Sequence, residues 1–284
     1  MIEDLQITIL ADNAIFNRDL LAEHGLAILV EAGGRRILFD TGQGRVLTAN
    51  AAALGCALET LDAIVLSHGH YDHTGGIAQV LQLGGKPRIF AHPAALGPKF
   101  AKRGQPPHRD IGMPDASREA LGSAGDRLVT TESVTEVAPG VWCTGEIPRT
   151  HAAESGFFLD PACRELDPLI DDQALFVETC DGIVVITGCA HAGLVDTLDR
   201  VAQITGQDRI FAVAGGFHLM LSERDAWEAA GNALGRREVQ WIAPVHCTGF
   251  GAQAYLHARF HSRAIEAGAG RRLEFRKGAH RPAN

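Results

Sequence analysis

A short histidine-rich stretch constrains this chain more than any other part of its sequence. Residues 67–76 read Ser-His-Gly-His-Tyr-Asp-His-Thr-Gly-Gly, so four side chains of metal-binding type fall within six consecutive positions. These are His68, His70, Asp72 and His73. The apolar run 63–66 before them is typical of a buried strand, and the apolar spacing in 75–83 favours a helix. The stretch is therefore predicted to be a turn between a strand and a helix.

The spacing of these four side chains indicates metal chemistry. His68 and His70 lie two positions apart in extended backbone, so they project to the same side, while Asp72 and His73 follow where the helix begins. Two pairs of ligands can form two centres. Neutral imidazole binds zinc, iron and manganese, and a carboxylate adds a hard oxygen ligand. The alternative, a polar turn with hydrated histidines, does not account for four ligand-type side chains in six residues.

The pattern His-x-His-x-Asp-His, preceded by Leu38-Phe39-Asp40-Thr41-Gly42, resembles the signature of the metallo-β-lactamase superfamily, and further matching segments extend to Gly249. The resemblance implies an α/β fold, a four-layer αββα sandwich of two similar halves with a one- or two-metal site at one edge. It also implies that Asp40 supports the site by holding a ligating histidine through its other ring nitrogen. A simple turn or helix cap is the alternative for Asp40.

A weak internal repeat agrees with two similar halves. Sliding the chain by 147 positions places Glu31 on Glu178, one predicted hairpin on another, and the strand before His68 on the strand before His218. With 46% apolar residues, 284 residues can bury a full core, and we expect a single domain over 1–284. Residues at about 94–132 are rich in proline, glycine and basic side chains, which favours a loop-rich insertion or lid.

Charge and composition exclude several classes of function. The net charge is −8 and there is no Lys/Arg-rich run, so nucleic-acid binding is not indicated. No apolar run approaches the roughly 18 residues of a membrane helix, and the N-terminus does not resemble a leader peptide, so we expect a cytoplasmic protein that does not bind membranes. The six cysteines are expected to be reduced thiols. The sequence does not indicate an oligomeric state.

The basic side chains within 94–132 leave two interpretations open. They could bind a phosphate or carboxylate substrate, or they could belong to a solvated surface loop. The side chains concerned are Lys99, Lys102, Arg103, His108 and Arg109.

The histidine cluster cannot complete a binuclear site alone, so further ligands are expected from the second half. His191 and His246 each follow an apolar strand and lie in a glycine-bearing loop that permits close backbone approach. His246 fits the last ligand histidine of the superfamily. The aspartate that usually bridges two metals in that superfamily would align with Gly188-Cys189 and is absent. Cys189 is therefore either a thiolate ligand or a buried structural thiol.

Four further segments resemble one subgroup of the superfamily, which is named for 7,8-dihydropterin-6-ylmethyl-4-(β-D-ribofuranosyl)aminobenzene 5′-phosphate synthase. They read Gly-Glu-Ile-Pro-Arg, Thr-Gly-Cys-Ala-His-Ala-Gly, Gly-Gly-Phe-His and His-Cys-Thr-Gly. The resemblance implies that His191 is a ligand and that Arg149 and His218 contact substrate. A surface ion pair and a core histidine are the respective alternatives.

The sequence departs from this subgroup after Arg149. His151 and Ala153 precede Glu154, where members commonly carry a threonine and a phenylalanine. His151 is a further candidate for a ligand, although its spacing to Gly156 is too long for the general motif.

These residues predict a metal-dependent enzyme with two divalent ions. One ion would be held by His68, His70 and His191, and the other by Asp72, His73 and His246. Zinc is the first expectation, with manganese or iron as alternatives. A metal-bound hydroxide would attack a small phosphate-ester or acyl substrate, and Asp72 could also transfer protons as a catalytic residue.

Two other functions stay open. The first is a transferase of the synthase type, in which the metals orient the pyrophosphate of a pterin substrate as leaving group. The second is a non-catalytic metal-binding or redox module. In either enzymatic case the partner is a small molecule, anionic or pterin-like.

Overall fold

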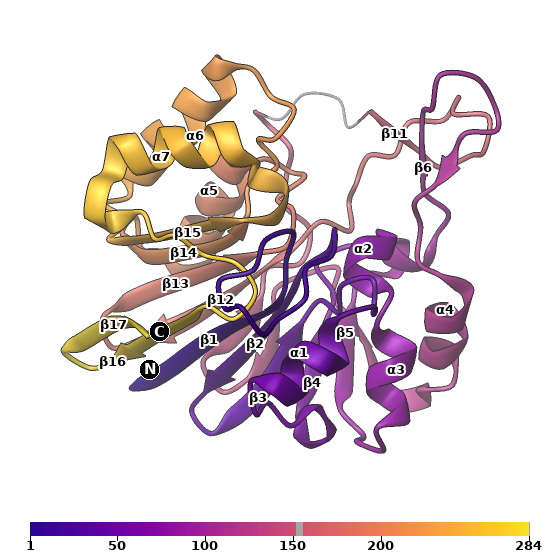
Figure 1. The fold of residues 1–284 in the computed structure, drawn as a ribbon. Helices are drawn as coiled ribbons and strands as arrows, with labels where there is room; N and C mark the ends of the chain where they lie inside the picture. Colours follow the sequence, from indigo (N-terminus) through magenta and orange to yellow (C-terminus); the bar gives the residue numbers. More distant parts are fainter. Residues whose placement is uncertain (152–155, 284) are drawn as a thin grey trace.

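Two mixed sheets face each other and hold an apolar core between them (Figure 1). The computed structural model describes residues 1–151 and 156–283, so Ala153 and Glu154 lie outside the described residues. The first sheet has the strand order β17-β16-β1-β2-β3-β4-β5-β8. Its strands are β1 Asp4–Ala11, β2 Ala27–Ala32, β3 Arg35–Phe39, β4 Ala63–Val65, β5 Arg88–Ala91, β8 Leu128–Thr130, β16 Arg272–Arg276 and β17 Ala279–Ala283.

The second sheet has the order β15-β14-β13-β12-β10-β9. Its strands are β9 Thr135–Ala138, β10 Val141–Cys143, β12 Ala174–Thr179, β13 Gly182–Thr187, β14 Ile210–Gly216 and β15 Trp241–Val245. A small third sheet joins β11 Phe157–Phe158, β6 Phe100–Ala101 and β7 Arg109–Asp110, and it projects beyond the sandwich (Figure 1).

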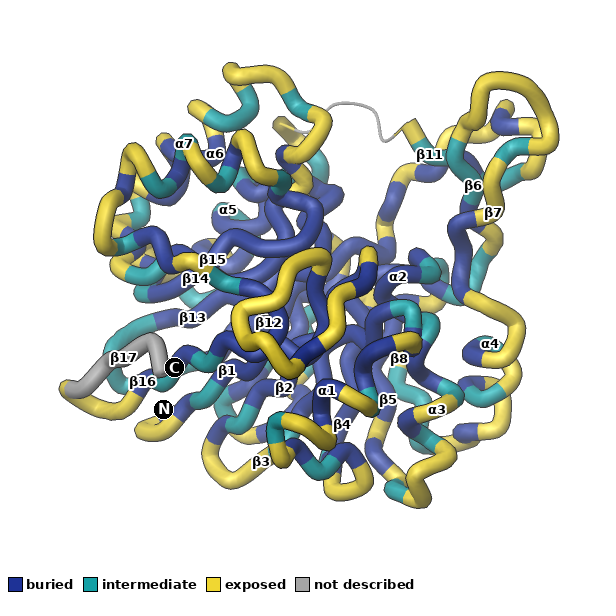
Figure 2. Tube along the Cα trace, in the orientation of Figure 1, coloured by how far each residue is buried: buried dark blue, intermediate teal, exposed yellow. Residues whose placement is uncertain are grey.

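Helices cover the outer face of each sheet and complete the four layers. The first sheet carries α1 Leu47–Ala53, α3 Ile77–Gln82 and α4 Asp115–Gly122, and the second carries α5 Leu194–Thr205, α6 Arg224–Arg236 and α7 Phe250–Phe260. Alternate residues of one strand face different layers: Ile28 and Val30 enter the core between the sheets, whereas Leu29 packs under the helices. Burial on both faces explains the nearly continuous apolar runs of these strands (Figure 2).

The predicted repeat is present in the topology. Strands β2, β3, β4 and β5 pair antiparallel, parallel and parallel in succession, and β12, β13, β14 and β15 do the same. The corresponding helices α1 and α5 begin at Leu47 and Leu194, at the same offset as β2 and β12. The expected αββα sandwich of two similar halves is therefore confirmed.

The segment 94–132 is more ordered than its composition indicates. Strand β8 extends the first sheet by pairing with β5, and α4 packs against α3, so the later part of the segment belongs to the scaffold. Sequence reasoning missed β8 because three residues are too few to show a period. Lys99, expected at a substrate or on a solvated loop, is buried in ion pairs with Asp167 and Asp171. Within the described residues, no helix is long and apolar enough to cross a membrane.

Candidate metal centre

The predicted site residues follow the carboxyl ends of parallel strands, which meet at one edge of the sandwich. Asp40 follows β3, and the turn that bears His68 and His70 follows β4. In the second sheet His191 follows β13 and His246 follows β15. Asp72 and His73 lie on the short helix α2, Tyr71–Thr74. The fold therefore brings these seven residues together from four separate parts of the chain.

His68, His70 and His191 form what we call the first donor set. One ring nitrogen from each lies within 4.8 Å of the other two. The side-chain Nε2 atoms of His70 and His191 are buried and have no hydrogen-bond partner among the described residues. Burial lowers the pKa of all three imidazoles, that of His70 to about 3, so they are neutral and able to donate a lone pair.

Asp72, His73 and His246 form the second donor set, whose donor atoms also lie within 4.8 Å of one another. The Oδ2 atom of Asp72 is 3.9 Å from His73 Nε2 and 3.6 Å from His246 Nε2. Burial lowers the pKa of His246 to about 4, and its buried Nε2 has no hydrogen-bond partner in the described chain. Burial alone would raise the pKa of Asp72, but His73 and His24 lower it, which keeps the carboxylate ionised.

The two sets fit divalent ions on chemical grounds. Buried polar atoms are normally hydrogen-bonded, so the unpartnered Nε2 atoms of His191 and His246 at this edge need an explanation. Three imidazoles in one set, and two imidazoles with a carboxylate in the other, are donor combinations that zinc accepts with a position left open. Zinc or a similar divalent ion would satisfy the Nε2 atoms of His191 and His246, whereas His70 faces His68 Nε2 through its Nδ1 atom, at 3.0 Å, and would offer that atom.

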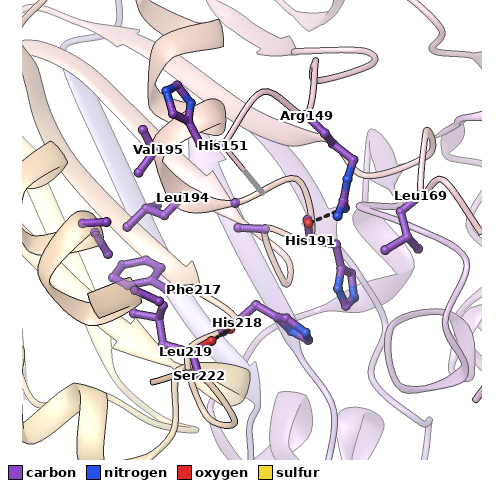
Figure 3. Close-up of a pocket in the computed structure, with 15 residues that line it drawn as sticks. Arg149, His151, Leu169, His191, Leu194, Val195, Phe217, His218, Leu219 and Ser222 are labelled. Atoms are coloured by element: carbon purple, nitrogen blue, oxygen red, sulfur yellow. Dashed lines mark hydrogen bonds between the residues drawn. The ribbon is translucent and has the colours of Figure 1, made fainter. Parts of the chain in front are cut away.

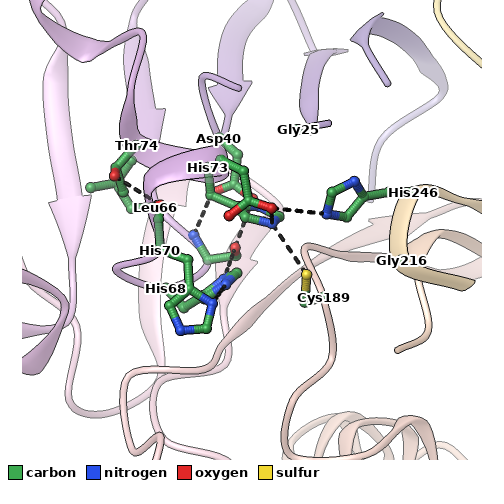
Figure 4. A network of polar contacts seen from close by, with 12 residues as sticks. Gly25, Asp40, Leu66, His68, His70, His73, Thr74, Cys189, Gly216 and His246 are labelled. Atoms are coloured by element: carbon green, nitrogen blue, oxygen red, sulfur yellow. Dashed lines mark hydrogen bonds and ion pairs between the residues drawn. The ribbon is translucent and has the colours of Figure 1, made fainter. Parts of the chain in front are cut away.

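Neighbouring side chains fix the ring orientations of the histidines, as Figure 4 shows. Asp40 Oδ2 lies 2.6 Å from His73 Nδ1 and 2.6 Å from Ser67 Oγ, and Ser67 Oγ lies 2.8 Å from His68 Nδ1. Asn13 Oδ1 lies 2.8 Å from His246 Nδ1. In each case the other ring nitrogen, Nε2, is directed into the site. Asp40 therefore contacts His73, a histidine of the second donor set, through the ring nitrogen that faces away from the site.

Backbone strain is concentrated around the same residues. Of the eight described non-glycine residues with positive φ, four are Asp40 (59°), Ala190 (54°), His218 (50°) and His246 (52°). Such conformations cost free energy and persist where the surrounding structure holds them. Their clustering supports a functional role for this edge.

Cys189 lies between the two donor sets. Its Sγ atom is 3.2 Å from His73 Nε2 and lies within 4.8 Å of donor atoms of both His68 and His73 (Figure 4). The Sγ atom of the buried Cys247 also lies within 4.8 Å of Cys189 Sγ. Both interpretations of Cys189, as ligand and as buried thiol, are compatible with this position.

A cavity of about 380 Å³ opens beside the first donor set (Figure 3). Its wall includes Arg149 and His218, the two predicted substrate contacts. Arg149 Nη1 donates a hydrogen bond to the backbone oxygen of His191 at 2.5 Å, and the ring of His218 lies 4.2 Å from that of His191. The volume is within the usual range for small-molecule sites.

His151 belongs to the rim of this cavity and not to the donor sets. Its side chain is 60% exposed, and its Nδ1 atom lies 2.6 Å from Asp196 Oδ1. None of the groups of donor atoms found among the described residues includes it. The alternative that made His151 a metal ligand is therefore not supported.

Sequence reasoning missed His24. Its half-exposed ring places Nε2 at 3.1 Å from Asp72 Oδ2, beside the second donor set. A single histidine in a polar loop carries no spacing signal, so nothing local in the sequence could have identified it.

Replacing Asp40 by asparagine is expected to lower metal affinity by about 10–100-fold, because the carboxylate that orients His73 is lost. Asparagine has the same size and tolerates the positive φ at this position. Competition with a chelator would measure the change. Asp160→Asn, in an exposed turn, is the control and should bind metal like the wild type. Unchanged affinity in Asp40→Asn would mean that the His73–Asp40 contact is dispensable.

Metal uptake is expected to release about one proton near pH 7.5. Burial opposes a charge on His73, but Asp40 and Asp72 raise its pKa to about 9. In the metal-free protein the charged ring contributes its full stabilisation of the folded state below about pH 6.5. This contribution is lost as the pH rises through about 9. Metal binding must displace the proton, so affinity should rise about tenfold per pH unit between 7 and 9. Calorimetry in buffers of different ionisation enthalpy would count the protons, and no release would contradict a charged His73.

The chain is similar to known proteins over nearly its whole length. The family model of the metallo-beta-lactamase superfamily matches residues 21–158. The 7,8-dihydropterin-6-methyl-4-(beta-D-ribofuranosyl)-aminobenzene-5'-phosphate synthase of Methanocaldococcus jannaschii is 29% identical over 289 residues, which cover 96% of this chain and 98% of that protein. An uncharacterized protein of the same organism is 32% identical, with 88% and 93% covered. The crystal structure of Tm1679, a metal-dependent hydrolase of the beta-lactamase superfamily, superposes with a TM-score of 0.81 at 30% identity, covering 95% of this chain and 98% of that one.

Proposed function

Because the chain belongs to the metallo-β-lactamase superfamily, we propose that it is a metal-dependent hydrolase whose two donor sets each hold one divalent ion, zinc in the first instance. The observation that carries the proposal is the pair of donor sets, each with its donor atoms within 4.8 Å, together with the buried Nε2 atoms of His191 and His246, which have no hydrogen-bond partner among the described residues. When bound, the ions would supply Lewis-acid activation of water and of a substrate oxygen.

The chain's own residues then bind the substrate and manage protons. Arg149 and His218 line the cavity next to His191, where they can bind an anionic group of a small substrate such as a phosphate ester or an acyl compound. The ionised carboxylate of Asp72 can accept a proton from the attacking water, and His24 lies within hydrogen-bond distance of that carboxylate. Phe157 from the small third sheet packs against His70 and His191 and covers the first donor set.

One observation favours a second candidate function. The similarity to the Methanocaldococcus jannaschii synthase spans nearly the full length of both chains. A transferase of that type would use the same donor sets but would join a dihydropterin to an aminobenzene ribofuranosyl phosphate, with pyrophosphate leaving the pterin. The same cavity would then bind two substrates.

Turnover with and without an acceptor distinguishes the two functions. Protein loaded with zinc, manganese or iron would be assayed on phosphodiester, ester and lactone substrates, and separately on a dihydropterin pyrophosphate with the aminobenzene acceptor. Hydrolysis without any acceptor supports the proposal. Pyrophosphate release that requires the acceptor supports the transferase instead. A metal-loaded protein that turns over neither class of substrate, and whose iron form absorbs visible light, would favour a redox module.

A further inference from the structure

Three consecutive polar residues outside the donor sets connect the loops that carry the first donor set. Asp171, Asp172 and Gln173 directly precede β12, and their exposed fractions are 0%, 1% and 2%. Burial of two carboxylates and an amide in sequence is costly unless each makes specific hydrogen bonds. Each of the three has at least one hydrogen-bond partner next to a histidine of the first donor set or in the turn that carries it, although Asp171 also pairs with Lys99 and Gln173 also accepts from Cys143 Sγ.

Two of these residues hold the turn that follows β4. Asp171 Oδ2 accepts a hydrogen bond from the backbone nitrogen of Gly69, between His68 and His70, at 2.8 Å. Gln173 donates from its backbone nitrogen to the oxygen of Ser67 at 3.0 Å and from Nε2 to that of Leu66 at 2.8 Å. Gly69 also packs closely against Ala95, because a Cβ atom at position 69 would lie 2.2 Å from the backbone oxygen of Ala95.

The middle residue holds the other loop. Asp172 Oδ2 accepts a hydrogen bond from the backbone nitrogen of Ala192, next to His191, at 2.7 Å. Its second oxygen, Oδ1, is buried without a hydrogen-bond partner in the part of the chain that the structure describes. One tripeptide thus binds a loop from the first sheet and a loop from the second.

This link matters because His68 and His70 come from one sheet and His191 from the other. A metal site requires its ligands within about 0.5 Å of the productive geometry, which separate loops do not provide unless they are tied together. The second donor set is held differently, through Asp40 on His73 and Asn13 on His246.

We propose that Asp171, Asp172 and Gln173 are positioning residues that hold the first donor set, and only that set, in the geometry that binds one ion. The inference rests on the proposed function, because it requires that the first donor set binds a metal.

The test measures zinc affinity by chelator competition in two backgrounds. His246→Ala leaves the first donor set intact, and His68→Ala leaves the second intact. Adding Asp172→Ala should lower the zinc affinity of the first donor set, measured in the His246→Ala background, by about 10–100-fold. It should lower the zinc affinity of the second donor set, measured in the His68→Ala background, by less than about twofold. Gln173→Met, which keeps the length of the side chain but cannot donate to Leu66, should act in the same way, so the test does not depend on one variant folding.

Two further variants separate positioning from general destabilisation. Asp172→Asn can still accept from Ala192 and should restore affinity to within about threefold of the parent. Asp62 Oδ2 accepts a hydrogen bond from the backbone nitrogen of Arg36 at 2.9 Å at the opposite end of β4, so Asp62→Ala should change neither site. Equal weakening of both sites, or of neither, by Asp172→Ala and Gln173→Met would overturn the inference while leaving the two metal sites in place. An unsubstituted chain that binds no metal would instead overturn the proposed function, and this inference with it.

Discussion

Replacing His246 by alanine is expected to remove one of two metal ions per chain and to reduce turnover by about 10³-fold or more. The unsubstituted chain should contain about two ions by elemental analysis. His246 is one of only three residues in the second donor set, so its loss leaves Asp72 and His73 as two ligands. Metal polarisation contributes several kcal/mol to the transition state, and each 1.4 kcal/mol corresponds to tenfold in rate.

His218→Ala is the matched control for this prediction. His218 lies in the same cluster of rings, 4.2 Å from His191, but belongs to neither donor set. Its replacement should leave the metal content unchanged, and any loss of activity should come from weaker substrate binding. Equal loss of metal from His246→Ala and His218→Ala would show that the ligands of the second half are misassigned.

The part of the candidate site that sequence could predict depends on local spacing. His68, His70, Asp72 and His73 lie in one turn, so their grouping follows from the strand before and the helix after them. The residues of the second half, His191 and His246, could be paired with this turn because each follows a strand of a repeated topology, and parallel strands end at one edge. The structure brings all six together; strand topology made the shared edge predictable, and the resemblance to the superfamily singled out His191 and His246 among the later histidines.

The supporting contacts could not be predicted because they join residues that are distant in sequence and unremarkable locally. Asp171 bonds Gly69 across 102 positions, and Asn13 bonds His246 across 233. Neither pair belongs to a repeating pattern, and the partner in the first case is a backbone nitrogen, which any residue but proline provides. Such contacts follow from the way the loops pack once the two sheets have formed.

Replacing Lys99 by methionine is expected to destabilise the metal-loaded protein by about 3–5 kcal/mol, measured by chemical denaturation. The Lys99 side chain is 1% exposed, and its Nζ lies 2.8 Å from Asp167 Oδ2 and 2.9 Å from Asp171 Oδ1. Although burial alone would lower the pKa of Lys99, the two carboxylates raise it, so the ammonium is fully charged at neutral pH. Methionine has a similar volume but leaves two buried carboxylates without their cation.

Lys86→Met is the control, because Lys86 is exposed and its replacement should change stability by less than about 0.5 kcal/mol. Adding Asp167→Asn to Lys99→Met removes one of the two carboxylate charges that Lys99 faces and should recover part of the loss, since the two sites are in direct contact. A loss below about 1 kcal/mol in Lys99→Met would mean that water reaches the carboxylates. The expected large loss of stability would show instead that an internal ion pair fixes the Lys99 side chain. Because Asp171 also accepts a hydrogen bond from Gly69, the same ion pair would fix the turn that bears His68 and His70. In that case the first part of the 94–132 segment is anchored to the metal centre and cannot act as a freely moving lid.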